Sequence, residues 1–404
     1  MMWPFSTLIR DTSTAAGAED RSFITFDDYF GPPTYSGQNV SESNSVKLPA
    51  VYKCISLNSE MISSLPIDVF ARRGPARVPY QMPFWLQSPN DLQTTAEFIA
   101  MSQVSLDLDG NCFWLKASAS SGALAGLSVL DPTQVEPKLE LDADDKPTLI
   151  YYVQTAQGKE PMTPRSIVHL RAVTIPGQLR GLSPIACAKE TIGIGLSAEQ
   201  FGAQFFGAGA NLSGVIEAPG RLDEAVADMV RKQFAKKHGG ISKSHAVGIL
   251  SGGATWKPMS VKPDEAQFLE SRRYTATEIA NLFGCPPELV SDVEGAKGYV
   301  TALHARLRLW YLTGLLPRIT RLETALSSLL PRPAYVKFNT NALLRMDPAE
   351  RTAFYQAAQL GQWMTRHEIR ALEEMDPMTG GDEPLKSVQW QENQPDSEPD
   401  EVTQ

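Results

Sequence analysis

The sequence predicts an α+β protein, with antiparallel strands in the first half of the chain and long helices in the second. Short apolar strands separated by Pro, Asp and Gly recur between residues 67 and 171. Apolar residues at helical spacing dominate after residue 183. A strand–helix–strand segment, 212–262, interrupts the helical half and reads as an insert between two paired helices.

The first half begins with an arm, residues 1–45, which is rich in Ser, Thr, Gly and Asp and is expected to be loosely held. Apolar residues recur at helical spacing from Val51 to Leu65, and Pro66 ends this helix before the strand 67–72. A second helix follows Thr94. Further strands are predicted within 126–141, 149–155 and 166–173, and the turn Asp109–Asn111 is expected to join two strands.

The second half begins at Ser183, which is expected to cap a single helix that starts at Pro184 and runs to residue 209. After the insert, the helix 264–283 is expected to stop at Pro286-Pro287. A loop then leads to residue 299.

A long helix follows from residue 300, and Pro317 is expected to bend it. The segment 337–345 is predicted to form a strand, and residues 347–384 a pair of helices. The acidic tail 385–404 is expected to be disordered.

The composition of the chain argues against several classes of protein. The 404 residues carry a net charge of −9, which argues against a broad basic surface that grips phosphate backbones. No apolar run approaches the roughly 18 residues that span a membrane, and the N-terminus lacks a secretory signal pattern. The four cysteines are far apart, so reduced and mostly buried thiols are expected at Cys54, Cys112, Cys187 and Cys285.

Motifs for catalysis are weak. Gly193-Ile-Gly195-Leu-Ser-Ala198 fits a degenerate dinucleotide fingerprint, but it lies inside a helical pattern, which favours close helix packing. A soluble α/β nucleotide-binding enzyme is kept as the alternative. The chain has no P-loop, HExxH or GxSxG motif, and His169 is expected to be a satisfied histidine. We therefore predict no catalytic residue, cofactor or metal site.

The order of landmarks resembles the HK97-like portal proteins of tailed bacteriophages from about Val40 to Pro384. The landmarks are Cys54–Pro66, Pro89-Asn90, Gly110-Asn111, His169, Gly181–Pro184, DEAQFLESRR, EIANLFGCPP and Gly361–Arg370. Two residues depart from the pattern, because valine is expected in place of Cys285 and asparagine in place of His367.

The resemblance implies a ring of subunits, usually twelve, around a channel for double-stranded DNA. It divides the chain into the arm (1–45), wing (46–182), first stem helix (183–211), clip (212–262), second stem helix (263–284), tunnel loop (285–299), kinked helix with a wing strand (300–346), crown (347–384) and tail (385–404). The large terminase and head-tail adaptor proteins would dock on the clip, and the major capsid protein would surround the ring. This implies a virion protein that assembles in the host cytoplasm.

The candidate site residues follow from this division. In the tunnel loop, Val290 and Val293 would present apolar surface, Asp292 and Glu294 would repel phosphates, and Lys297 would partly compensate; Ser291 lies among them. An ordinary surface loop is the alternative. In the clip, a partner contact and a simple complement to the helix dipole are equally good explanations of Arg231, Lys232, Lys236 and Lys237.

Overall fold

The computed structural model describes residues 34–141, 144–207, 214–217, 255–258, 265–291, 300–340, 348–373 and 375–382. The chain forms two compact units. The first comprises Met1–Ser64 with Asp68–Lys337, and the second comprises Leu65–Ile67 with Phe338–Gln404.

Residues 34–45 belong to the packed first unit, so the expectation of a loosely held arm is wrong for them. They contain the short helix α3 (Glu42–Ser45), and Val40 and Ser45 are fully buried. The Tyr35 amide donates to Glu190, and the Gln38 side chain donates to Gln200 at 2.7 Å. Burial of apolar Val40 therefore holds this segment, despite its polar composition.

Two helices form the centre of the first unit. They are α4 (Pro49–Ser63) and α6 (Thr95–Leu108), and the short α5 (Phe84–Gln87) precedes α6. Thr94 begins α6 with a capping box, because its side chain accepts from the Glu97 amide while the Glu97 carboxylate accepts from the Thr94 amide. Pro66 follows α4 and β1 begins at Ile67, as the sequence predicts.

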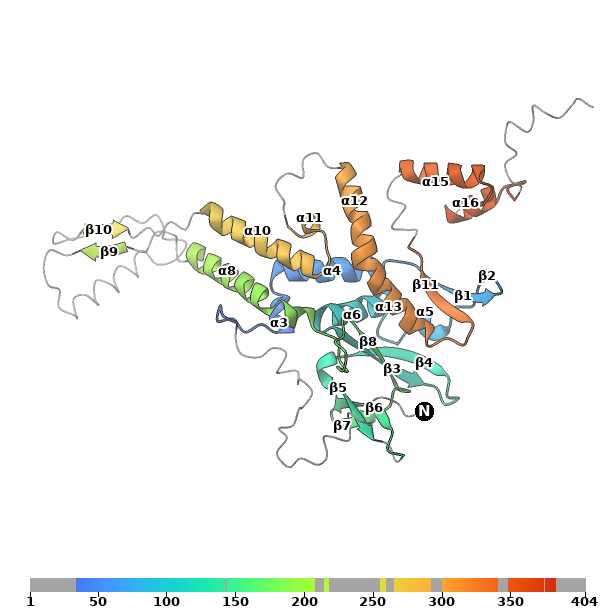
Figure 1. The fold of residues 1–404 in the computed structure, drawn as a ribbon, viewed down its shortest axis with the longest axis horizontal. Helices are drawn as coiled ribbons and strands as arrows, with labels where there is room; N and C mark the ends of the chain where they lie inside the picture. The colour runs from blue at the N-terminus through green and yellow to red at the C-terminus, as the bar shows by residue number, and fades with distance from the viewer. Residues whose placement is uncertain are drawn as a thin grey trace, which may run out of the picture. The chain divides into compact units, whose positions relative to one another are not determined.

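Three small sheets surround these helices (Figure 1). Their strand orders are β11-β1-β2, β4-β3-β8 and β5-β6-β7. The bounds are β1 (Ile67–Arg73), β2 (Ala76–Pro79), β3 (Asn111–Ser118), β4 (Leu124–Leu130), β5 (Val135–Leu141), β6 (Pro147–Thr155), β7 (Gly158–Met162), β8 (Ile167–Arg171) and β11 (Ala334–Phe338). The described registers are antiparallel, which confirms the α+β prediction.

Two boundaries differ from the sequence prediction. Asp109–Asn111 joins helix α6 to strand β3, because the residues before it continue the buried face of α6. The last strand of the unit begins at Ala334 rather than residue 337, since Ala334 and Val336 already alternate inward with Phe338. Strand β7 was not predicted, because its polar sequence lacks an apolar alternation.

The paired helices are α8 (Lys189–Gly207) and α10 (Glu265–Leu282), which lie side by side in Figure 1. Ser183 caps α7 (Pro184–Cys187) as predicted, by accepting from the Ala186 amide. The expected single helix is nevertheless interrupted at Ala188. Of the segment 212–262, the structure describes an antiparallel pair, β9 (Gly214–Glu217) and β10 (Thr255–Pro258).

The remaining helices of the first unit are α11 (Pro287–Val290), α12 (Val300–Trp310) and α13 (Leu316–Ser327). A π-helical turn, Tyr311–Leu315, joins α12 to α13. Pro317 lies in the first turn of α13, where a missing amide costs least. The irregularity therefore falls immediately before the proline that was expected to bend the helix.

The second unit contains a helical hairpin of α15 (Pro348–Leu360) and α16 (Arg366–Leu372). Arg351 pairs with Glu373 at 3.3 Å, and the Tyr355 hydroxyl donates to the same carboxylate at 2.5 Å. Phe354 and Trp363 pack edge to face with centroids 5.3 Å apart. These contacts confirm the predicted pair of helices, while the tail 385–404 lies outside the described residues.

Candidate functional site

The segment expected to line a channel, 285–299, contains α11 and leads to α12, and the structure describes it as far as residue 291. Of its candidate residues, Val290 and Ser291 are described, whereas Asp292, Val293, Glu294 and Lys297 lie outside the described residues. What the structure presents is the base of this loop, formed by the end of α10, α11, α12, the π-helical turn and the start of α13.

Helix α10 ends in a glycine turn rather than at the prolines. Gly284 has φ +64°, a left-handed conformation that favours glycine. The Cys285 amide donates to the Ala280 carbonyl at 2.8 Å, and the Gly284 amide donates to Asn281 at 3.1 Å, as in a Schellman-type end. Pro287 then opens α11, so the diproline begins the next helix instead of stopping the previous one.

A buried polar junction holds the end of α10. The Arg318 guanidinium donates to the Phe283 carbonyl at 3.0 Å, to the Gly314 carbonyl at 2.8 Å and to the Asp107 carboxylate at 3.3 Å. Asn58 also donates to the Phe283 carbonyl, at 3.3 Å. Burial raises the pKa of Asp107, and the Arg318 charge opposes that rise. Arg318 therefore connects α6, the end of α10 and the π-helical turn, and Asn58 adds α4 to this junction.

The backbones of the two loop flanks also approach each other directly. A Cβ placed on Gly314 would lie 2.7 Å from the Gly284 carbonyl oxygen and 2.7 Å from Cδ1 of Trp310. Only glycine fits such a contact without a shift of the backbone or of a buried ring. The π-helical turn is thus packed against the glycine turn that ends α10.

Two further contacts hold α11. Glu288 of α11 forms an ion pair with Arg306 of α12, which joins the two flanks a second time. Val290 packs against the core cluster that contains Ile279 and Phe283. Val290 is partly buried by this packing, which helps to hold the base of the loop, and its contact with a channel stays a prediction.

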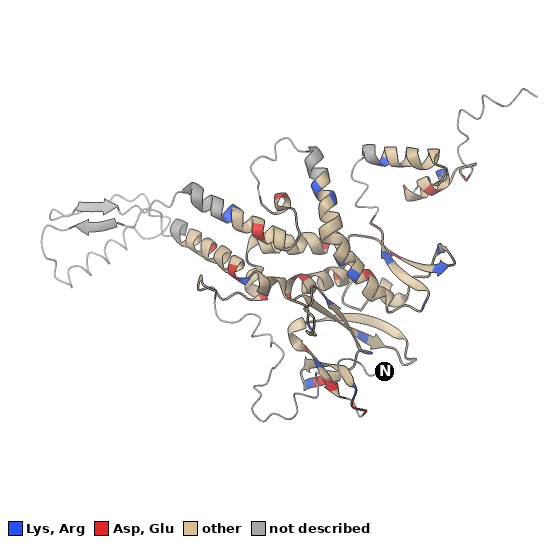
Figure 2. Ribbon diagram, in the orientation of Figure 1, with Lys and Arg blue, Asp and Glu red and all other residues tan. Residues whose placement is uncertain are grey.

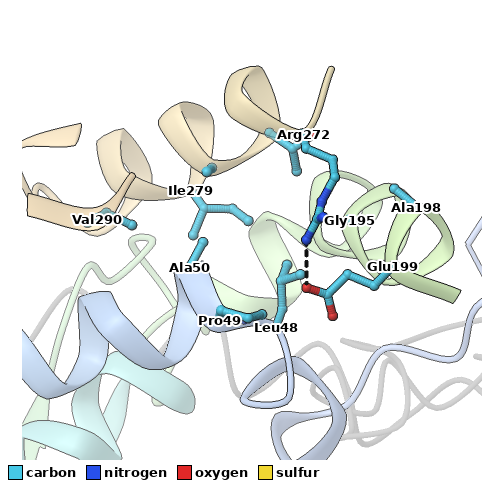
Figure 3. A pocket seen from close by; sticks show the side chains of 11 residues that line it. Leu48, Pro49, Ala50, Gly195, Ala198, Glu199, Arg272, Ile279 and Val290 are labelled. Carbon is cyan, nitrogen blue, oxygen red and sulfur yellow. Dashed lines mark hydrogen bonds and ion pairs between the residues drawn. The ribbon is translucent and has the colours of Figure 1, made fainter. Parts of the chain in front are cut away.

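A small apolar pocket adjoins this base (Figure 3). It has a volume of about 140 Å³ and lies between the start of α4, one face of α8 and one face of α10, with Val290 at one end. At its rim Arg272 of α10 reaches across to Glu199 of α8, with 3.4 Å between Nη2 and Oε1. Its lining is mainly small and aliphatic.

Three landmark residues of the first half of the chain, Asn111, His169 and Gly181, form a hydrogen-bonded cluster. The Asn111 amide donates to the Gly181 carbonyl at 3.0 Å, and its oxygen accepts from the Gly181 amide at 2.6 Å and from His169 at 3.1 Å. Burial, with the charges of Arg171 and Arg180, lowers the pKa of His169 to about 3. The ring is therefore neutral and hydrogen-bonded, which confirms His169 as a satisfied histidine rather than a base.

Close packing also explains the glycines beside this cluster and within α8. A Cβ on Gly110 would collide with the Leu182 carbonyl. Within α8, a Cβ on Gly193 would meet the Thr34 side chain at 2.8 Å, and one on Gly195 would meet Leu48 at 2.8 Å. Since both α8 glycines lie inside a helix and face packed segments, the packing interpretation is confirmed over a nucleotide-binding turn.

Other candidate residues are placed as follows. Cys54, Cys112 and Cys285 are buried thiols, and Cys187 is exposed. Arg231, Lys232, Lys236 and Lys237 lie outside the described residues. Across the described ranges, no group of three or more His, Cys, Asp or Glu side chains is arranged to hold a metal ion. None of the described helices is long and apolar enough to cross a membrane.

Sequence reasoning missed Asp107 and Arg318. One signal was available, because Asp107 falls on the face of the helix 95–108 that also carries Phe98, Ile99 and Leu106. An acid on an apolar face requires a buried partner. Nothing in the local sequence identifies that partner as Arg318.

Known phage portal proteins match most of this chain. Residues 49–374 match the sequence model of the family described as "Phage portal protein". The chain is 31% identical over 381 residues to the "Probable portal protein" of Streptomyces phage phiC31, covering 90% of this chain and 83% of that protein. It is 28% identical over 364 residues to the "Portal protein" of Enterobacteria phage HK97, covering 87% and 84% respectively.

Solved structures share the fold. The chain resembles a protein in the neck of a native gene transfer agent particle computed with C12 symmetry, with a TM-score of 0.58, 22% identity and coverage of 84% of this chain and 95% of that one. It also resembles a crystal structure of an HK97-family phage portal protein from Corynebacterium diphtheriae, with a TM-score of 0.54, 16% identity and coverage of 76% and 99%.

Proposed function

The chain belongs to the phage portal protein family, and we propose that its copies close into a ring, usually of twelve, whose central channel passes double-stranded DNA. The observation that carries this proposal is the family match over residues 49–374, which includes the whole loop base. The fold shared with a C12-symmetric neck supports a twelvefold ring.

The subunit acts as a conduit rather than an enzyme. The landmark residues Asn111, His169 and Gly181 bond to one another within the fold, and the glycines of α8 serve packing. Force for DNA movement would come from a separate ATPase, because the chain has no P-loop.

The loop 292–299 would form the narrow part of the channel. Asp292 and Glu294 against Lys297 leave each copy with a net negative loop. Each phosphate that a cation neutralises adds salt-dependent affinity, so a net negative lining keeps the duplex from sticking. The base supports this role, because Arg318, Gly314 and Gly284 hold both loop flanks firmly while the loop itself spans between them.

The partners follow from the ring. The large terminase would dock on the clip, 212–262, during packaging, and head-tail adaptor proteins would replace it afterwards. Arg231, Lys232, Lys236 and Lys237 are the candidate contacts there. The ring would sit in the capsid among copies of the major capsid protein, after assembly in the host cytoplasm.

Imaging tests the ring directly. Purified protein examined by negative-stain electron microscopy and native mass spectrometry should show closed rings of about twelve copies, with a central hole wide enough for double-stranded DNA. Assemblies without a central opening, or a monomer under every assembly condition, would refute the proposal.

A charge variant tests the loop. Asp292→Lys with Glu294→Lys should leave ring formation intact, retard DNA in the channel and make packaging more sensitive to salt. Asp144→Lys with Asp145→Lys, in the turn between β5 and β6, is the matched control. Normal packaging by the loop variant would exclude the conduit role of the loop but not the ring.

A further inference from the structure

The inference concerns how neighbouring copies fit together, and it rests on the proposed ring. We propose that the pocket between α4, α8 and α10 receives the leucine ridge of the adjacent copy. The leucine ridge is the exposed stripe formed by Ala305, Arg308 and Leu309 of α12 together with Leu312 of the π-helical turn that follows it.

The pocket is shaped to accept one apolar side chain. Its walls carry Ala50, Gly195, Ala198 and Ala276, and Ile279 forms its floor (Figure 3). An apolar cavity of about 150 Å³ accommodates a molecule the size of benzene. The pocket volume of about 140 Å³ therefore matches a single leucine side chain.

The leucine ridge is an apolar surface without a place in the subunit core. Leu309 is 58% exposed and Leu312 50% exposed, whereas Trp310 and Leu315 on the other face of the same helical segment are buried. Residues 305, 308, 309 and 312 follow the i, i+3, i+4, i+7 spacing of one helix face. A helix with one face already buried and a second apolar face exposed is suited to contact another chain.

The charges near the leucine ridge and near the pocket are also complementary. Helix α12 carries Arg306 and Arg308 and no acidic residue, whereas α8 carries Glu190 and Glu199 with one cation, Lys189, at its start (Figure 2). Glu199 lies at the rim of the pocket. Its ion pair with Arg272 is half-exposed and therefore weak, so Arg308 beside an inserted Leu309 can share that carboxylate.

A second copy is the occupant that these observations favour. Pocket and leucine ridge are different surfaces of one subunit, so their union is a head-to-tail contact, which closes into a ring when the rotation between copies divides a full turn. The fold shared with a C12-symmetric neck is in keeping with this type of contact.

Crosslinking between two different chains tests the placement. One chain carries Ala276→Cys and a size tag, and the other carries Leu309→Cys. Both also carry Cys187→Ser, which removes the exposed native thiol. After assembly from an equal mixture, copper–phenanthroline accepts two electrons as the two thiols lose their protons and form a disulfide. A band of one tagged and one untagged chain is expected.

The matched control is Ala203→Cys paired with Leu309→Cys, because Ala203 is an exposed residue of α8 that does not line the pocket. The control should give little or no mixed band. A mixed band of equal strength from the control would overturn the inference, as would rings that give no mixed band from the pocket chain. Either failure would leave the ring itself standing.

Assembly provides an independent readout. Leu309→Ser, on the exposed leucine ridge, should raise the protein concentration for half-assembly by about tenfold or more, without changing the melting temperature of the free subunit. Ala276→Leu should do the same by filling the pocket, with Ala203→Leu as its control. Unchanged assembly by Leu309→Ser would overturn the inference. A wild-type chain that forms no ring would overturn both this inference and the proposed function.

Discussion

The Arg318 guanidinium contacts the Asp107 carboxylate at 3.3 Å through two of its nitrogens, although the two residues are 211 positions apart in the chain. The same guanidinium reaches the last carbonyl of the α10 segment, at Phe283. A partly buried cation thus connects the core helix α6 to both flanks of the loop 292–299. Replacement of Arg318 should therefore destabilise both the core and the base of the loop.

Replacement of Arg318 by methionine is expected to destabilise the subunit by about 3–5 kcal/mol, because it leaves Asp107 as an unpaired buried acid. The carbonyls of Phe283 and Gly314 also lose the Arg318 donor, and Phe283 then keeps only the bond from Asn58. Urea unfolding of the free subunit measures the loss. Arg73→Met, at an exposed position of β1, should stay within about 0.5 kcal/mol of wild type.

The double variant Arg318→Met with Asp107→Leu separates the charge from the packing. It should recover part of the lost stability, since the uncompensated acid is gone while the bonds from Arg318 to the carbonyls of Phe283 and Gly314 remain lost. A double variant less stable than Arg318→Met alone would show that the ion pair is not the source of the effect.

The contacts around Gly314 and Gly195 predict that alanine lowers the melting temperature by different amounts at the two positions. Gly314→Ala should lower the melting temperature more than Gly195→Ala, because its Cβ meets the Gly284 carbonyl and the Trp310 ring at 2.7 Å. The Cβ of the Gly195 variant meets the methyl groups of Leu48, at 2.8 and 3.3 Å, and of Thr275, at 3.4 Å, and these side-chain ends can shift more easily than a backbone carbonyl. Differential scanning calorimetry of both variants decides this, and equal losses would contradict the contact geometry.

Glu42 predicts a pH dependence of stability. Burial, together with the nearby charges of Asp109 and Asp131, raises the pKa of Glu42 to about 7 from an ordinary value of 4.5. The folded state therefore binds a proton that the unfolded chain releases, so stability falls as the pH rises from about 4.5 to 7. After screening by solvent the fall should be on the order of 1–2 kcal/mol.

The isosteric variant Glu42→Gln checks the source of this dependence. Because glutamine cannot ionise, the variant should flatten the stability profile between pH 4.5 and 7 and raise the melting temperature at pH 8. Melting curves collected across this range provide the measurement. A profile in Glu42→Gln as steep as that of wild type would assign the dependence to other groups.

His367 is expected to tolerate asparagine. Its Nδ1 lies 2.7 Å from the Asp382 carboxylate, and its Nε2 accepts from the Met378 amide at 2.9 Å. An asparagine amide offers the same donor and acceptor, so His367→Asn should stay close to wild type in stability. His367→Ala should cost about 1–2 kcal/mol and speed exchange of the Met378 amide hydrogen. Equal damage by both variants would contradict this equivalence.

Much of the fold could be predicted from local pattern. Helix α6 after Thr94, the cap at Ser183 and the paired helices α8 and α10 follow from periodicity and capping, which act over a few residues. The features that the sequence did not predict have weak local signals. Residues 34–45 are polar and are held by the burial of Val40 and by hydrogen bonds to Glu190 and Gln200, while β7 lacks any apolar alternation.

The loop base was less predictable. Gly284 and the diproline marked the end of α10 in the sequence, but the partner that secures this end is Arg318, in a different helix. The sequence by itself determined the α+β class, the order of the helices, the family and the absence of a P-loop, because these are properties of local pattern and motif order. Only the tertiary structure decided that Val290 packs against the core, that the Asp107 carboxylate pairs with Arg318, and that α4, α8 and α10 leave a pocket between them. Such contacts join residues hundreds of positions apart, and only the packing of side chains and backbones selects them.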